Sequence, residues 1–229
     1  MTHQQAERIT ARVEFAKRGR LRFVGHLDTA RAIMRAVRAA GLPARTTQGC
    51  SPHLDASFGP PLPLGLTGNS EFFDVRLTEP VDPAAAREAL QAHLPDGLEI
   101  CSVRLMTGKT ESLGARLDRA DYTVHVPAEV TIAPETIEQF LASDEAVVVR
   151  TRGERQRAVN VRRYVERLEA FDEPGGRTRL EMTIVMTPEG SASAAEVLGI
   201  LVGEEAARQP GVRIERDRVY HAADDATAR

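Results

Sequence analysis

Short segments of alternating hydrophobic and polar residues characterise the first half of the chain. The alternation predicts strands at residues 9–16, 72–77 and 98–106, since side chains along a strand point to opposite faces in turn. Apolar residues recur at helical spacing over residues 27–40. A second helix is predicted at residues 83–94, because an aspartate followed by a proline is typical of a helix start. These three strands and two helices make five of the six elements of a β-α-β-β-α-β order, and we interpret the first half as this pattern.

The second half is predicted to repeat this order. Its expected strands are residues 121–126, 146–151, 158–171, 178–186 and 212–220, and its expected helices are residues 134–141 and 194–208. Strands 158–171 and 178–186 would form a hairpin that turns at Pro174, Gly175 and Gly176. We therefore expect an α+β fold of two tandem ferredoxin-like (βαββαβ) modules with antiparallel sheets, at residues 8–110 and 118–222, followed by a disordered tail at residues 223–229.

The helix over residues 27–40 is predicted to be amphipathic and to end at Gly41, with Pro43 beyond it. The positions expected on its apolar face are Leu27, Ala30, Ile33, Met34, Val37 and Ala40. A loop rich in proline and glycine follows at residues 48–68, and its prolines exclude a regular central strand. A loop of this length in a compact domain is usually functional or mobile. It would either shape a binding cleft or cover a sheet edge.

Composition restricts the class of protein more than its function. The 229 residues carry a formal net charge of −3, which does not suggest a nucleic-acid binder as a whole, although the arginines are clustered. There is no tryptophan, and two cysteines do not make a disulfide scaffold at this length. We find no apolar stretch near the roughly 20 residues that a membrane span needs, and no secretory leader. These features lead us to expect a cytoplasmic protein with no membrane partner.

Three stretches of the sequence carry a specific resemblance. They are Arg20-Leu21-Arg22-Phe23-Val24-Gly25-His26-Leu27-Asp28, Gln48-Gly49-Cys50-Ser51-Pro52-His53 and Ser57-Phe58-Gly59-Pro60-Pro61-Leu62-Pro63-Leu64-Gly65. Together with Glu71-Phe72-Phe73-Asp74, they resemble a bacterial domain family of unknown function that is called radical-SAM-linked. Its members are often fused to, or encoded beside, radical SAM proteins. The resemblance implies a radical SAM protein as partner, with RNA or a ribosome-linked molecule as the substrate class.

The chain itself cannot hold the iron–sulfur cluster of a radical SAM enzyme. That cluster needs three cysteine thiolates close together, commonly spaced C-x₃-C-x₂-C. The two cysteines here, Cys50 and Cys101, lie far apart in the sequence. We therefore expect no cofactor in this chain.

Two clusters of basic residues could hold phosphates through charge-assisted hydrogen bonds. In the first, a turn with Lys17, Arg20 and Arg22 precedes the cationic face of the first helix. In the second, Arg150 to Arg163 form a strand–turn–strand with guanidiniums expected on both faces. Solvated helix faces and charged edge strands explain such runs equally well. The candidate ligand-binding residues are Lys17, Arg20, Arg22, His26, Asp28, Arg31, Arg35, Gln48, Ser51, His53, Arg155, Arg157 and Arg162.

Two His-x-Asp pairs offer other chemistry. If loop 48–65 folds over the helix start, His26, Asp28, His53 and Asp55 would meet. Such a set could bind a metal ion, and His26 or His53 could act as a general acid or base. Asp28 could instead cap the helix, and His26 could bond to a backbone carbonyl.

The sequence thus favours a non-catalytic module that recognises RNA or another anionic ligand for a radical SAM partner. Two alternatives stay open. One is an RNA-processing or RNA-modifying enzyme that uses His26 or His53 as acid or base. The other is a protein-interaction module that binds no nucleic acid.

Overall fold

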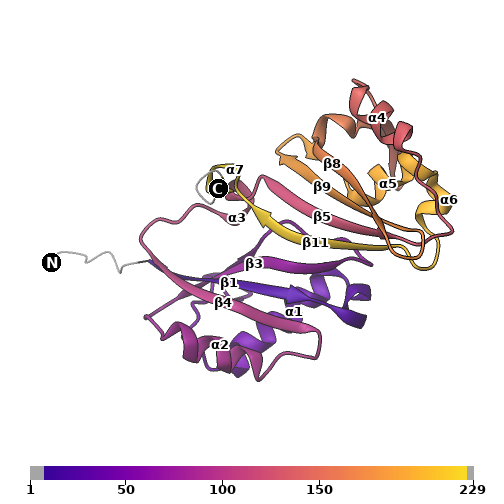
Figure 1. Cartoon of the computed structure of the whole chain (residues 1–229). Helices are drawn as coiled ribbons and strands as arrows, with labels where there is room; N and C mark the ends of the chain where they lie inside the picture. Colours follow the sequence, from indigo (N-terminus) through magenta and orange to yellow (C-terminus); the bar gives the residue numbers. More distant parts are fainter. Residues whose placement is uncertain (1–7, 226–229) are drawn as a thin grey trace. The chain divides into compact units, whose positions relative to one another are not determined.

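The chain divides into two compact units in the computed structural model, Met1–Leu117 and Asp118–Arg229, and the structure describes residues 8–225 (Figure 1). Both units mix helices with an antiparallel sheet, so the chain is an α+β protein. Among the described residues, no helix is both long and apolar enough to cross a membrane.

The first unit has four antiparallel strands in the sheet order β2-β3-β1-β4. One strand, β2, lies inside the loop in which no regular central strand was expected, and it pairs with the edge of β3. The elements are β1 (Ile9–Lys17), η1 (Gly19–Phe23), α1 (His26–Ala39), β2 (Ala56–Phe58), β3 (Thr67–Leu77), α2 (Pro83–Gln91), β4 (Leu98–Thr107) and α3 (Leu113–Arg116).

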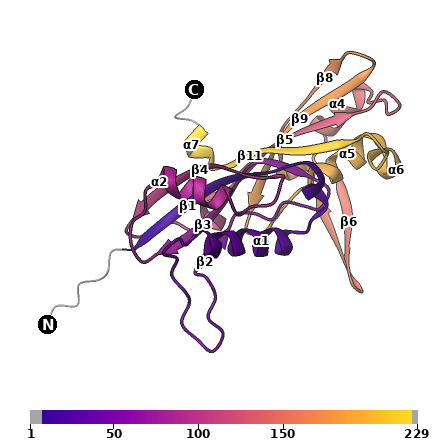
Figure 2. The same ribbon diagram turned by 90° about the horizontal axis from the view of Figure 1, so that it is seen from below.

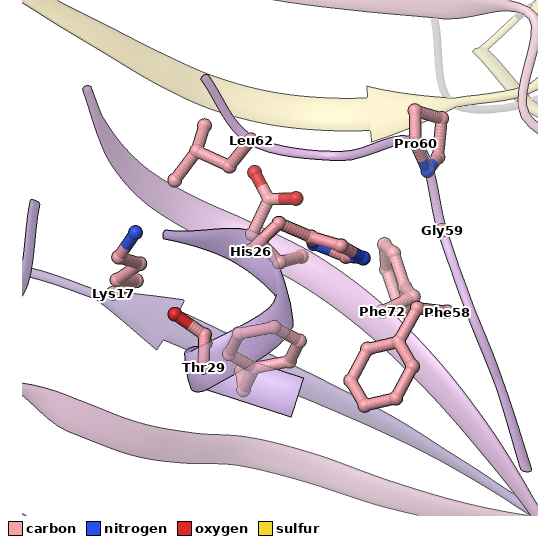
Figure 3. A pocket seen from close by; sticks show the side chains of 10 residues that line it. Lys17, His26, Thr29, Phe58, Gly59, Pro60, Leu62 and Phe72 are labelled. Carbon is pink, nitrogen blue, oxygen red and sulfur yellow. The ribbon is translucent and has the colours of Figure 1, made fainter. Parts of the chain in front are cut away.

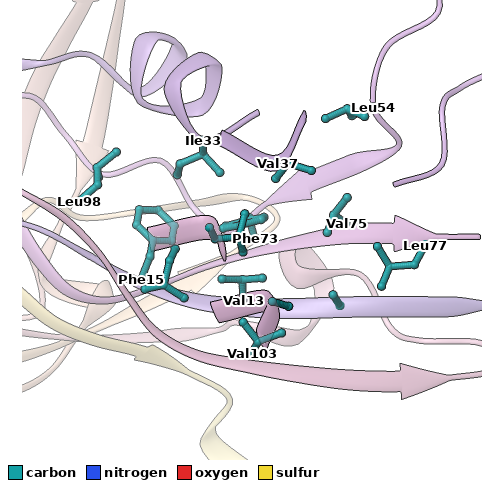
Figure 4. Packing of buried hydrophobic residues seen from close by; sticks show 14 residues of the cluster. Val13, Phe15, Ile33, Val37, Leu54, Phe73, Val75, Leu77, Leu98 and Val103 are labelled. Carbon is teal, nitrogen blue, oxygen red and sulfur yellow. The ribbon is translucent and has the colours of Figure 1, made fainter. Parts of the chain in front are cut away.

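The core of the first unit lies between one face of this sheet and helices α1 and α2 (Figure 4). Val13 and Phe15 of β1 alternate with polar residues, and the Phe15 ring lies 5.9 Å from that of Phe73. Ile33 and Val37 of α1 pack onto them and are fully buried. The alternation read from the sequence therefore identifies the buried side of β1.

The buried face of α1 differs from the expected one. Thr29, Ile33, Ala36 and Val37 are buried, whereas Leu27 is 69% exposed. Thr29 can occupy a buried position because its hydroxyl donates a hydrogen bond to the Gly25 carbonyl, at 3.0 Å. The apolar face was thus predicted with the wrong phase at its first turn.

The second unit has a sheet in the order β8-β9-β5-β11, in which all neighbours are antiparallel, with the short β10 also paired to β9. Strands β6 and β7 form a separate two-stranded sheet. Figure 2 shows this hairpin extending away from the strands of the larger sheet. The elements are β5 (Arg119–Val126), α4 (Pro134–Ala142), β6 (Val147–Arg152), β7 (Arg155–Asn160), η2 (Arg162–Tyr164), β8 (Val165–Glu173), β9 (Arg177–Thr187), β10 (Gly190–Ser191), α5 (Ala194–Val202), α6 (Glu204–Ala207), β11 (Arg213–Tyr220) and α7 (Ala222–Asp225).

Three predictions for this unit were wrong in detail. The strand expected at 158–171 is interrupted by η2, where Val161 and Tyr164 are buried. The helix expected at 194–208 breaks at Gly203, whose positive φ of 84° no helix accommodates. The expected tail is helical at its start, in α7, and its last residues, 226–229, lie outside the described residues.

Candidate functional site

A small pocket of the first unit collects side chains from four segments (Figure 3). The end of β1, the first turn of α1, the chain that follows β2, and β3 all contribute to it. Its lining residues are Phe15, Lys17, His26, Thr29, Phe58, Gly59, Pro60, Leu62, Glu71 and Phe72. Most of them fall in the stretches that carry the family resemblance.

Two opposite charges are buried in this pocket. Lys17 is 2% exposed and Glu71 is 4% exposed. Lys17 Nζ donates a hydrogen bond of 2.6 Å to the carbonyl oxygen of Val24. Because a buried charge is costly unless it is compensated, Lys17 and Glu71 need polar partners inside the protein, and the Val24 carbonyl is one such partner for Lys17. Lys17 was expected in a turn, but it is the last residue of β1 and its side chain is buried.

The Glu71 side chain lies over a glycine that leaves room for it. A Cβ atom on Gly68 would stand 2.6 Å from Glu71 Oε1 and 2.8 Å from Cγ, which is closer than real Cβ contacts allow. The backbone of Gly68 does not have a positive φ, so a conformational need does not explain this glycine. Its missing side chain instead fixes where the carboxylate lies.

His26 is the first residue of α1, and its ring meets an aromatic stack. The imidazole lies edge-on to Phe58, with ring centroids 5.7 Å apart, and Phe58 stacks on Phe73 at 5.6 Å. Gly25 precedes the helix and provides no side-chain cap. The pocket therefore faces the positive end of the α1 dipole.

The pocket as it stands is small. Its cavity volume is about 20 Å³, which holds one water molecule and no nucleobase. Any larger ligand must therefore be bound on the surface around it.

That surface carries apolar and cationic side chains, which we call the rim: Arg20, Arg22, Phe23, Leu27 and Leu64. Arg22 is half-buried and the other four are exposed. Phe23, Leu27 and Leu64 are 62%, 69% and 65% exposed. The Arg22 guanidinium lies over the Phe23 ring, 4.7 Å from its centroid. The amide of Gly65 donates to the Arg22 carbonyl at 2.7 Å, and this bond brings Leu64 close to the 3₁₀ turn η1.

A row of arginines continues from the rim along α1. Leu27, Arg31, Arg35 and Arg38 are exposed and spaced so that they follow one side of the helix. Arg31 is paired with Asp28 at 2.9 Å, so Asp28 serves an ion pair in the first turn. Among the described residues, no ion pair includes Arg35 or Arg38.

Three candidate residues from the first part of the loop, Gln48, Ser51 and His53, do not line the pocket. Gln48, Ser51 and His53 are exposed, and His53 Nδ1 lies 3.1 Å from Thr47 Oγ1 and 3.2 Å from the Ser51 carbonyl.

The proposed meeting of two His-x-Asp pairs was wrong. Asp55 lies 4.0 Å from Arg76, Asp28 pairs with Arg31, and His53 bonds within its own loop. No group of three or more metal-ligating side chains occurs in the part of the chain that the structure describes. The backbone turns back on itself before His53 can approach His26, as the bridge between Thr46 and Leu54 shows.

The second basic segment is also more ordered than expected. Arg150 stands opposite Arg157 in the hairpin register, and Arg155 is two residues from Arg157, so the three side chains share one face. The expectation of guanidiniums on both faces was therefore wrong. Arg162 lies outside the hairpin, in η2, and donates to the main-chain carbonyls of Val165 and Leu141.

Arg150 is bound to a helix. Its Nε and Nη2 donate to the Glu196 carboxylate of α5 at 2.6 and 2.7 Å. Burial alone would raise the pKa of Glu196, but the hydrogen bonds from Arg150 and from the Ser193 amide outweigh it and hold this pKa below its ordinary value. Arg155 and Arg157 remain exposed, without an ion-pair partner among the described residues.

A family model described as an uncharacterized protein conserved in bacteria (DUF2344) matches residues 10–194, which is most of the chain. The chain belongs to the DUF2344 family. No curated protein matches its sequence.

Two solved structures are similar to this DUF2344 chain over 91% of its length, each at 11% identity. One is a chain of a Cbf5-Nop10-Gar1 complex, with a TM-score of 0.46, of which 48% is covered. The other is a chain of an H/ACA RNP bound to a substrate RNA containing 2'-deoxyuridine, with a TM-score of 0.44 and 47% covered. The DUF2344 chain thus spans about half the length of these solved chains, and likeness at this level assigns it no function.

Sequence reasoning missed Glu71 and Thr29 as pocket residues. Glu71 shares its strand face with Phe73, Val75 and Leu77, which are all buried. A carboxylate on the buried side of an alternating strand is a signal that could have identified it.

Proposed function

We propose that this DUF2344 protein is a non-catalytic recognition module that binds single-stranded RNA on the first unit, across the rim and the arginine row of α1. The observation that carries the proposal is the exposed Phe23, with the Arg22 guanidinium on its ring, together with Arg35 and Arg38 on α1, which form no ion pair with any described residue.

The two halves of this surface suit the two parts of a nucleotide. Guanidiniums bind phosphates through bidentate, charge-assisted hydrogen bonds. An exposed aromatic ring provides a platform on which an unpaired base stacks, whatever its identity. The net charge of −3 requires that the attraction be local, as the row on α1 provides.

We further propose that each unit is a ferredoxin-like module, one at residues 8–110 and one at residues 118–222. The strand orders β4-β1-β3-β2 and β11-β5-β9-β8, with antiparallel neighbours, support this assignment, with the β6–β7 hairpin as an insertion in the second module.

The proposed partner is a radical SAM protein in the cytoplasm. The support is the resemblance of residues 20–28, 48–53 and 57–65 to radical-SAM-linked domains. The partner would supply the cluster for which this chain has too few cysteines, and this chain would present the RNA.

Titration of a fluorescein-labelled single-stranded RNA at several salt concentrations tests the proposal. Each neutralised phosphate on a single strand contributes about −0.7 to the slope of log K against log salt. The double variant Arg35→Ala/Arg38→Ala should therefore reduce the magnitude of the slope by about 1.4.

Arg155→Ala/Arg157→Ala is the matched control, since it removes two exposed cations from the other unit. An equal loss in this control, or binding that does not depend on salt, would refute the site.

Replacement of Phe23 separates stacking from charge. Phe23→Ala should weaken binding by about 5- to 150-fold, the equivalent of 1–3 kcal/mol for one stacked base, and should leave the salt slope unchanged. Phe23→Trp should retain binding. If alanine and tryptophan behave alike, no base stacks on residue 23.

A second candidate function is acid–base chemistry on RNA. It is favoured by the position of His26 in the pocket with Lys17 and Glu71, whereas His53 lies apart. His26→Gln should then abolish conversion of a bound RNA without changing its affinity. A His26→Gln protein that converts RNA like the wild type would exclude this candidate.

A further inference from the structure

The β6–β7 hairpin of the second unit has one open edge. Its two-residue turn, Gly153-Glu154, has a positive φ of 60° only at the glycine, as in a type II′ hairpin. In such a hairpin the residues that flank the turn exchange hydrogen bonds, and bonded and non-bonded pairs then alternate. The N–H and C=O groups of Val147, Val149 and Thr151 therefore point away from β7.

These outward groups have no partner strand. β6 pairs only with β7 among the described strands, and no hydrogen bond between described residues uses the outward groups. Natural proteins usually cover or charge such an edge, because it is a template for another strand. Here the edge is apolar, since Val147 and Val149 are 52% and 61% exposed.

A groove of about 960 Å³ runs along this edge, between β6 and the helices α5 and α6 of the same unit. On the helix side, the small residues Ala195 and Gly199 leave it open, and Ile200 adds an apolar wall. The bond from Arg150 to Glu196 crosses between strand and helix and holds the two walls together. The groove is therefore built for an extended chain, because it pairs an open backbone edge with room for side chains.

The two faces of the β6–β7 hairpin differ in charge, so an extended chain bound along β6 would have a different environment on each of its own faces. Arg155 and Arg157 are exposed on the Arg150 face, and Glu196 neutralises only Arg150. The opposite face of β6 carries Val147 and Val149. Successive side chains of a strand added to β6 would alternate between a cationic face and an apolar face.

We propose that the open edge of β6 binds an extended segment of a partner protein, as an added β-strand whose side chains alternate between acidic and apolar. This interaction uses different residues from the RNA surface of the first unit and does not depend on it. Backbone hydrogen bonds to Val147, Val149 and Thr151 supply affinity, and the two faces specify the sequence.

RNA fits this edge less well than a peptide does. A row of backbone amide and carbonyl groups matches another strand, and exposed valines offer no ring for base stacking. A second copy of the same chain fits less well too. Antiparallel pairing of β6 with β6 would bring no acidic side chain to the cationic face, because β6 itself carries none.

Fluorescence anisotropy with two labelled synthetic peptides tests the proposal on the full chain. One peptide alternates valine with glutamate, and its matched probe alternates valine with lysine. The glutamate peptide should bind at least about tenfold more tightly. Arg155→Glu/Arg157→Glu should reverse this preference.

Two variants test the groove and the edge separately. Gly199→Leu fills the groove from α5, where a Cβ meets nothing closer than Glu204 Cγ at 3.9 Å, so the helix retains its fold. It should weaken the glutamate peptide by at least about tenfold. Gly114→Leu, at an exposed position of helix α3 in the first unit, is the matched control and should change nothing. Val149→Pro removes one outward N–H and should weaken binding similarly.

Several results would overturn the proposal. These are equal binding of the two peptides, unchanged affinity in Gly199→Leu, or competition by single-stranded RNA that is lost in Arg155→Ala/Arg157→Ala. A concentration-dependent dimer that Val149→Pro abolishes would assign the edge to a second copy instead.

Discussion

Replacement of Gly68 by alanine tests the most constrained contact of the pocket. The added Cβ would lie 2.6 Å from Glu71 Oε1 and 2.8 Å from Cγ. The Glu71 side chain cannot move out to solvent, because the residue is only 4% exposed. Either the carboxylate or strand β3 must therefore shift.

The net cost follows from two opposing terms. Overpacking of a buried site costs about 1–3 kcal/mol. Since Gly68 has no positive φ, alanine can adopt its backbone conformation. Alanine also lowers the conformational entropy of the unfolded chain, which stabilises the folded state by about 0.4–1 kcal/mol. We expect Gly68→Ala to lower the free energy of unfolding of the first unit by about 1–2 kcal/mol.

Urea unfolding followed by two probes can locate this loss. The three tyrosines, Tyr122, Tyr164 and Tyr220, all belong to the second unit, and the chain has no tryptophan. Circular dichroism should therefore show an earlier transition, by about 0.5–1 M urea for a slope near 2 kcal/mol per M. Tyrosine fluorescence should report an unchanged midpoint.

A double-mutant cycle provides the decisive control. In a Glu71→Ala background the clash is absent, so Gly68→Ala should be neutral or stabilising. If Gly68→Ala costs the same in both backgrounds, the glycine is not there for the carboxylate, and the reasoning about the pocket is wrong.

Three further predictions concern other sites. Arg12 donates two hydrogen bonds of 2.9 Å to the buried Asp74 carboxylate, so Arg12→Met should leave that carboxylate without its cation and lower the free energy of unfolding by about 3–5 kcal/mol. The double variant Arg12→Met/Asp74→Leu should recover most of this free energy, as measured by urea unfolding. The hydrogen bonds that lower the Glu196 pKa mean that its pair with Arg150 contributes fully above about pH 4 and loses this contribution as the pH falls through the lowered pKa. Arg150→Gln should therefore lower the tyrosine-detected midpoint at about pH 7, and the difference from the wild type should shrink as the pH falls below about 4. Burial, with help from nearby carboxylates, raises the pKa of Cys101, whereas Cys50 is exposed. A disulfide reagent should therefore modify Cys50 fast and Cys101 slowly, and equal rates would contradict this.

Residue alternation and helical spacing were enough to predict most of the elements of both units. They failed where a single residue changes the path of the chain. Gly203 ends α5 inside the predicted helix, and buried Val161 ends β7 inside the predicted strand. Periodicity sums over many residues, so it does not detect a break that one backbone angle produces.

The phase of α1 failed for another reason. Leu27 is apolar and was placed inside, whereas Thr29 is polar and was left out. Thr29 is buried because its hydroxyl bonds to the Gly25 carbonyl one turn earlier. A hydrophobicity pattern has no term for a polar group that is satisfied by its own helix.

The arginine and lysine clusters show why the candidate site was only partly predictable. Lys17 and Arg162 counted as free cations in the sequence, yet main-chain carbonyls hold both. These carbonyl groups belong to residues next to short 3₁₀ turns, and the periodicity of the sequence does not predict where such turns place a carbonyl. Arg35 and Arg157, by contrast, lie in the same two arginine-rich segments of the sequence and are exposed. Charge density along the sequence therefore overestimates a binding surface, and only those cations that the backbone leaves unpaired can attract a ligand to a protein whose net charge is negative.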